Sequence, residues 1–311
     1  MKLNKLLGWL IVVLVGYYFF TALSRNWEQV RQIDFAITTE AITATLLYAL
    51  AVVVSGWLWG KVFRQVTGRH VSTVESIRAH TAAWVLKYIP GQIGAYVYKL
   101  RWGQSHWASK TSSTTAFIYE ALFLTLASTI FVIPILLLTV GDTMGASLFI
   151  VYVVAVLAVL LLSRSKFYEL IRLLIKKVTG KKIGDVYVFS IKQMLAYTGW
   201  FTISRVINAV GFVVLAVSVL PVTADMYLPL GAAYILAGII GIYAFFVPSG
   251  LGVREAVIVA FAAIYFTTEE AIVLSLLARL YATVADGLLG LLYIYLTKRN
   301  KPNNSMEAEA V

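Results

Sequence analysis

Eight apolar runs follow one another along the chain, and several are long enough to cross a lipid bilayer as helices. Such a crossing needs about 20 mostly apolar residues. Hydrophobic residues make up 60% of the chain and charged residues only 13%. The short alternating segments of a membrane β-barrel are absent from the sequence, so we predict an all-α polytopic membrane protein. The predicted spans are Leu6–Leu23, Ile42–Val62, Thr115–Leu138, Ala146–Leu162, Met194–Leu220, Leu228–Val247, a shorter Gly252–Phe266, and Ala271–Leu296.

The sequence predicts a single integral-membrane domain over residues 1–298, followed by a polar, disordered cytoplasmic tail at residues 299–311. The chain has no cysteine, so it can form neither a disulfide nor a thiolate metal site. It also has no Walker-type nucleotide loop, and its histidines, His70, His80 and His106, lack metal-ligand spacing. We therefore expect no cofactor, no metal and no catalytic residue.

Basic residues indicate how the chain is oriented in the membrane. Of the 26 lysines and arginines, 21 lie at the N-terminus, in residues 61–114, in residues 163–193 or in the tail, whereas Arg25 and Arg31 lie on the opposite side. The positive-inside rule then places both termini and the two basic loops in the cytoplasm, at the plasma membrane. The net charge of +11 indicates contact with the anionic cytoplasmic leaflet and not with nucleic acid.

One apolar run is interrupted by Pro248-Ser249-Gly250-Leu251-Gly252-Val253-Arg254-Glu255. Proline removes a backbone donor, so the incoming helix should break near Val247. Gly250 and Gly252 permit backbone conformations and close approaches that other residues do not. Arg254 and Glu255 would then fall in the first turn of a new helix. Open backbone at bilayer depth is tolerated only inside protein or along a watery cavity, so this break is predicted to line a site.

A second break lies in the cytoplasmic loop at Pro90-Gly91-Gln92-Ile93-Gly94, between two amphipathic segments. Both ends of this region should be cytoplasmic, which indicates an interfacial or re-entrant hairpin. The two breaks share the pattern β-branched, proline, two residues, aliphatic, glycine, at Ile89–Gly94 and Val247–Gly252. Paired interruptions of this kind are typical of transporters built from inverted repeats, and they predict a possible internal repeat.

Six ionisable residues lie within apolar runs, where each charge costs roughly 2.5–3.5 kcal/mol unless it is paired or hydrated. They are Glu120, Arg205, Arg254, Glu255, Arg279 and Asp286. One interpretation is that they neutralise one another as buried pairs that hold the helices together. The other, which we favour, is that they line a polar cavity, because ionisable residues inside a membrane are candidates for a site.

The segment Pro248–Glu255 resembles the Pro-x-Gly-x-Gly-x-Arg-Glu signature of the lysylphosphatidylglycerol synthase transmembrane region, also called the flippase-like domain family. Pro90–Gly94, followed by Tyr98, Lys99 and Leu100, is similar to the first signature of that family. The resemblance implies a flippase-like membrane domain linked to cell-envelope lipids. In two-part members, lysyl transfer belongs to a separate soluble domain, for which 311 residues leave no room, so we expect no enzyme activity.

These observations predict a lipid translocator that moves a phospholipid or polyprenol-linked lipid between leaflets, with its phosphate held at the helix start beside Arg254. The alternative is a non-transporting scaffold or accessory subunit for an envelope lipid or glycan enzyme. An ion-coupled small-solute transporter is disfavoured, because arginines do not release protons. The sequence predicts no oligomeric state. The predicted substrate-binding residues are Arg205, Arg254, Arg279, Glu120, Glu255 and Asp286, with Pro90, Gly91, Gly94, Pro248, Gly250 and Gly252 forming the walls.

Overall fold

The computed structural model describes residues 38–88, 93–140, 187–244 and 250–299, together with Glu169 and Leu173. The ordered elements in these ranges are all helical, which confirms the predicted all-α class for this part of the chain. The α-helices are α3 (Thr39–Thr67), α4 (Thr73–Val85), α5 (Ile93–Ser105), α6 (Lys110–Val140), α9 (Ile191–Val219), α10 (Tyr227–Tyr243), α11 (Val253–Ala262) and α12 (Thr268–Arg299). Short 3-10 helices follow α4 (η1, Leu86–Tyr88) and precede α10 (η3, Ala224–Met226).

Five of the described helices are long and apolar enough to cross a membrane, namely α3, α6, α9, α10 and α12. Each corresponds to one of the predicted spans. The span predicted at Gly252–Phe266 instead contains α11, a helix of 10 residues. At 1.5 Å per residue it reaches about 15 Å, roughly half the hydrocarbon core. The predicted spans Leu6–Leu23 and Ala146–Leu162 lie outside the described residues.

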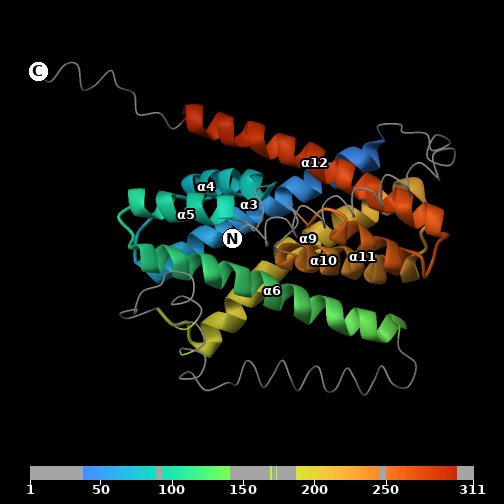
Figure 1. Cartoon of the computed structure of the whole chain (residues 1–311), viewed down its shortest axis with the longest axis horizontal. Helices are drawn as coiled ribbons and strands as arrows, with labels where there is room; N and C mark the ends of the chain where they lie inside the picture. The colour runs from blue at the N-terminus through green and yellow to red at the C-terminus, as the bar shows by residue number, and fades with distance from the viewer. Residues whose placement is uncertain are drawn as a thin grey trace, which may run out of the picture.

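The helices form one bundle in which α12 and α6 run along opposite sides, with α3, α9 and α10 between them (Figure 1). The hairpin of α4 and α5 lies toward one end and α11 toward the other. Helix α3 is central, because it packs against α4, α6, α9 and α12. A buried hydrogen bond of 2.7 Å between the hydroxyls of Ser55 and Ser204 joins α3 to α9.

Several helices begin where a polar side chain caps their first turn. Thr38 accepts from the amide of Ala41 at the start of α3, and Ser72 accepts from the amide of Glu75 at the start of α4. Ser190 forms a reciprocal capping box at the start of α9. Such caps contribute about 1 kcal/mol each. They fix where the polar connections end and the apolar helices start.

Helix α4 packs very closely against α3 at two glycines spaced four residues apart. A Cβ at Gly60 would lie 2.1 Å from Ser76 Oγ, and one at Gly56 would lie 3.0 Å from the Cβ of His80. Small residues at this spacing let two helix backbones approach closely. The close contact brings His80 to the interior, although the sequence predicted α4 to be an amphipathic part of a cytoplasmic loop.

The turn before α11 confirms the conformational role predicted for its glycines. Gly250 and Gly252 have φ values of +66° and +79°, which disfavour residues with a side chain. A Cβ at Gly250 would lie 2.6 Å from the Cα of Gly241 on α10, so the two backbones cross in contact. The Glu255 carboxylate accepts from the Gly252 amide at 2.6 Å and holds the first turn of α11.

Candidate functional site

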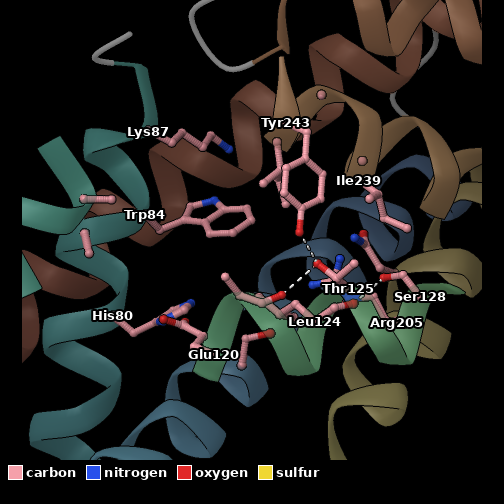
Figure 2. A pocket seen from close by; sticks show the side chains of 18 of the residues that line it. His80, Trp84, Lys87, Glu120, Leu124, Thr125, Ser128, Arg205, Ile239 and Tyr243 are labelled. Carbon is pink, nitrogen blue, oxygen red and sulfur yellow. Dashed lines mark hydrogen bonds and ion pairs between the residues drawn. The ribbon is translucent and has the colours of Figure 1, made fainter. Parts of the chain in front are cut away.

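The described helices enclose a cavity of about 140 Å³ lined by residues from α3, α4, η1, α5, α6, α9, α10 and α11. Figure 2 shows His80, Trp84 and Lys87 on one side of it and Arg205 on the other, with Glu120 between them on α6. Four cations and one carboxylate line the cavity: Lys87, Lys99, Arg205, Arg254 and Glu120. The cavity is therefore strongly positive.

Two of the cations, Arg205 and Arg254, form no salt bridge with the residues that the structure describes. Arg205 is only 7% exposed, and no described carboxylate lies within 4.0 Å of it or of Arg254. The Nε of Arg205 and the amide oxygen of Asn208 are both buried without a hydrogen-bond partner. Arg254 lies over the ring of Tyr234, 5.7 Å from its centre. Because buried charges are normally paired, the Arg205 guanidinium indicates a site for an anion, and the half-buried Arg254 lines the same cavity.

The third cation belongs to a buried cluster formed by α4, α5 and α6. Lys99 Nζ lies 2.7 Å and 2.5 Å from the two carboxylate oxygens of Glu120. His80 Nδ1 lies 3.1 Å from Lys99 Nζ and 3.2 Å from Glu120 Oε1. Burial lowers the pKa of Lys99, and the Glu120 charge offsets part of that effect. Glu120 therefore pairs directly with Lys99, and it acts on Arg205 only at longer range.

The fourth cation is held by the last helix. Lys87 Nζ lies 2.7 Å from Asp286 Oδ2 and 3.3 Å from the Tyr48 hydroxyl. The Trp84 indole donates to Asp286 Oδ1 at 2.8 Å, and Lys87 lies 4.4 Å from the centre of the same indole. Burial lowers the pKa of Lys87 to about 8, although Asp286 favours the charged form. The lysine charge therefore titrates close to physiological pH.

The structure brings only part of the predicted site together. Glu120, Arg205 and Arg254 line the cavity, whereas Glu255, Arg279 and Asp286 are not among its described lining residues. Arg279 lies 3.6 Å from the Glu255 carboxylate. Both interpretations of the six charges thus hold in part, because some form pairs and others line a cavity.

The structure describes three of the six proline and glycine residues that were predicted to form the walls of the site. Gly250 and Gly252 form the turn before α11, and Gly94 lies in the first turn of α5 beside a residue that lines the cavity. The Gly252 amide already donates to Glu255, so the phosphate site predicted at the start of α11 lacks that donor. Pro90, Gly91 and Pro248 lie outside the described residues.

Residues next to both breaks line the same cavity. Lys87 and Ala95 flank the first break, and Ala244 and Arg254 flank the second. The two interruptions, more than 150 positions apart in the sequence, therefore border one space. This placement is what a transporter built from repeats would have; the repeat itself stays a prediction.

The predicted site left out several residues that line the cavity: Tyr48, His80, Trp84, Lys87, Lys99 and Asn208. Four of them, His80, Trp84, Lys87 and Lys99, were missed because they lie in residues 61–114, which the sequence assigned to a cytoplasmic loop. One signal was present, since positions 80, 84 and 87 have the i, i+4, i+7 spacing of a single helix face. A histidine, a tryptophan and a lysine on one face of a short helix could have indicated a functional surface.

Comparison with known proteins agrees with the geometry of a charged cavity inside a helical membrane domain. A search of curated proteins found no match. The family model described as "Lysylphosphatidylglycerol synthase TM region" matches residues 5–290, more than nine-tenths of the chain. The match includes every residue that lines the cavity. The chain therefore belongs to the lysylphosphatidylglycerol synthase transmembrane-region family.

Proposed function

We propose that this protein moves a phosphate-bearing lipid between the two leaflets of the plasma membrane, with the headgroup passing through the cavity. The observation that carries the proposal is the buried guanidinium of Arg205 together with the half-buried guanidinium of Arg254, neither with a described carboxylate within 4.0 Å. A phosphate would supply the missing anion. Guanidinium binds phosphate oxygens through two parallel hydrogen bonds, which suits a phospholipid or a polyprenyl phosphate equally well.

The rest of the cavity suits an amphipathic ligand. Its wall between α6 and α10 includes Leu124, Ile239 and Ile242, which are apolar. A hydrogen bond of 2.7 Å joins Thr125 on α6 to the Tyr243 hydroxyl on α10 across this wall (Figure 2), and Tyr243 is 48% exposed. A headgroup could therefore occupy the charged interior while its chains pass between α6 and α10 into the bilayer.

The positive-inside pattern supports an orientation with both termini in the cytoplasm. In that orientation the anionic inner leaflet lies next to the basic connections. The proposal includes no lysyl transfer, because it rests on a match to the transmembrane region of the family.

A second function has its own support. The pairs Lys99–Glu120, Lys87–Asp286 and Arg279–Glu255 are compensated charges that could serve only to join helices. If Arg205 and Arg254 were also structural, the protein would be a scaffold or accessory subunit for an envelope enzyme. The two functions differ in whether these arginines retain an anionic lipid.

Mass spectrometry of lipids that co-purify after gentle extraction tests the proposal. The full chain is compared with Arg254→Met and with Arg69→Met, a control in which the same change is made at an exposed loop arginine. We expect an anionic or polyprenyl lipid to be enriched with the wild type and the control and lost with Arg254→Met. Equal bulk lipid in all three would reject translocation and favour the scaffold.

A further inference from the structure

His80 is a buried titratable group that anion binding by the arginines leaves unexplained. Its side chain is 4% exposed and lines the cavity, and its buried Nε2 atom has no hydrogen-bond partner among the described residues. The ring lies near the indole of Trp84, with centres 6.1 Å apart. Since a buried nitrogen without a partner costs roughly 1–3 kcal/mol, it should have a ligand in some state of the protein.

We propose that His80 binds a proton together with the lipid phosphate, so that headgroup binding and proton uptake are coupled. This inference rests on the proposed function, which it deepens by naming a second ligand of the same cavity. The proton would come from water and attach to the neutral imidazole. The resulting imidazolium would donate to Glu120 through Nδ1 and to a phosphate oxygen through Nε2. An N–H bond forms on the imidazole as an O–H bond of hydronium breaks, and no other covalent bond changes.

The empty cavity disfavours this protonation. Facing His80 are Lys99 from α5, Glu120 from α6 and, at longer range, Arg205 from α9. Tyr48 on α3 and Lys87 of η1 also line the cavity, and Asp286 of α12 binds Lys87. Burial and then the Lys99 charge lower the pKa of His80, and Glu120 offsets only part of the effect. Because the Glu120 carboxylate already forms an ion pair with Lys99, it neutralises a positive charge on His80 only in part.

A phosphate between His80 and Arg205 would reverse this balance, because it adds negative charge to a site enclosed by protein (Figure 2). Thermodynamic linkage makes the effect reciprocal: if phosphate favours protonation, protonation favours phosphate to the same extent. The affinity should then fall by up to about tenfold for each unit of pH increase between the pKa values of the free and the occupied histidine.

The experiment measures binding of dihexanoyl phosphatidylglycerol to the detergent-solubilised full chain by calorimetry. This phosphodiester keeps its single charge between about pH 5 and 6.5, a range that stays more than one pH unit below the pKa of about 8 for Lys87. Titrations in two buffers with different heats of ionisation count the protons taken up. The variants are His80→Gln and a matched control, His70→Gln, at an exposed position.

We expect the wild type and His70→Gln to take up close to one proton per lipid at a pH between the pKa values of the free and the occupied His80, and His80→Gln to take up none. Binding by the wild type without proton uptake would overturn the coupling and leave the proposed function standing. Uptake that persists in His80→Gln would assign the proton to another group and overturn the role of His80. If the wild type bound no lipid at any pH, the proposed function itself would fail. The wild-type proton count tests the coupling even where His80→Gln does not fold.

Discussion

Replacement of Arg205 by methionine should make the fold more stable while it removes anion binding. The arginine is 7% exposed, has no described carboxylate within 4.0 Å, and buries its Nε without a partner. Methionine keeps most of the apolar length of the side chain but carries neither the charge nor the donors. A site built for a ligand often lowers stability in this way, because its groups are satisfied only when the ligand is bound.

The magnitude follows from the unpaired donor. A buried polar group without a hydrogen bond costs about 1–3 kcal/mol, and an unpaired charge adds to that cost. For a chain of this size, each kcal/mol shifts the melting temperature by roughly 2 °C. Arg205→Met should therefore melt about 2–6 °C above the wild type in detergent without added lipid. Dihexanoyl phosphatidylglycerol should raise the melting temperature of the wild type but not that of the variant.

The matched control is Arg279→Met, since Arg279 lies 3.6 Å from the buried Glu255. Its removal leaves a carboxylate that is 3% exposed without its cation, so this variant should melt below the wild type. Arg279 is 21% exposed, and solvent screening keeps the loss at the low end of the values for buried pairs. If Arg205→Met lost as much stability as the control, Arg205 would be a structural residue and the ligand argument would be refuted.

Other changes act on the packing and on the remaining pairs. Gly250→Ala should lower the free energy of unfolding by more than about 2 kcal/mol, because φ is +66° and the backbone of α10 lies 2.6 Å from the added Cβ. A lower melting temperature than that of the wild type would show this loss. Glu120→Gln should cost about 3–5 kcal/mol, because it leaves the Lys99 ammonium buried without a carboxylate. Burial would raise the pKa of Glu75, but hydrogen bonds, first from Arg78, lower it below 4.5. Its contribution to stability is therefore present above pH 4.5 and lost as the pH falls, so melting temperatures of wild type and Glu75→Gln should converge in acid.

The changes at Gly250 and Glu120 each have a control that separates the stated cause from a general effect of substitution. Gly287→Ala places a Cβ in open space within α12, so it should not destabilise the protein. Adding Lys99→Met to Glu120→Gln removes the unpaired ammonium, and most of the lost stability should return. If Gly287→Ala were as harmful as Gly250→Ala, the backbone contact would not be the reason. No recovery in the double variant would contradict the pairing argument.

Much of the fold could be predicted because apolar length alone defines a membrane-spanning helix. The five spanning helices that the structure describes begin and end within a few residues of the predicted runs. The glycines of the second break were also predictable, since only a positive φ or a close backbone contact requires them. Local rules succeed here because the determining residues are close together in the chain.

The site was harder to predict because its contacts join distant parts of the sequence. Asp286 meets Lys87 across 199 positions, and nothing near either residue indicates the pairing. Lys99 and His80 lie in helices too polar to span a membrane, so counting charges assigned both to a cytoplasmic surface. Only their packing against α3 and α6 places them inside. Hydropathy measures the average character of a segment and does not show which single polar residue points inward.

The central claim is that the cavity carries phosphate-bearing lipid across the bilayer, and leaflet exchange in proteoliposomes tests it most directly. Vesicles containing the purified protein and a trace of chain-labelled fluorescent phosphatidylglycerol are treated with dithionite, which bleaches only the outer leaflet. We predict that wild type and Arg69→Met make most of the label accessible, whereas Arg254→Met protects the inner-leaflet label as protein-free vesicles do. Exchange at wild-type speed by Arg254→Met, or no exchange by the wild type, would contradict the account.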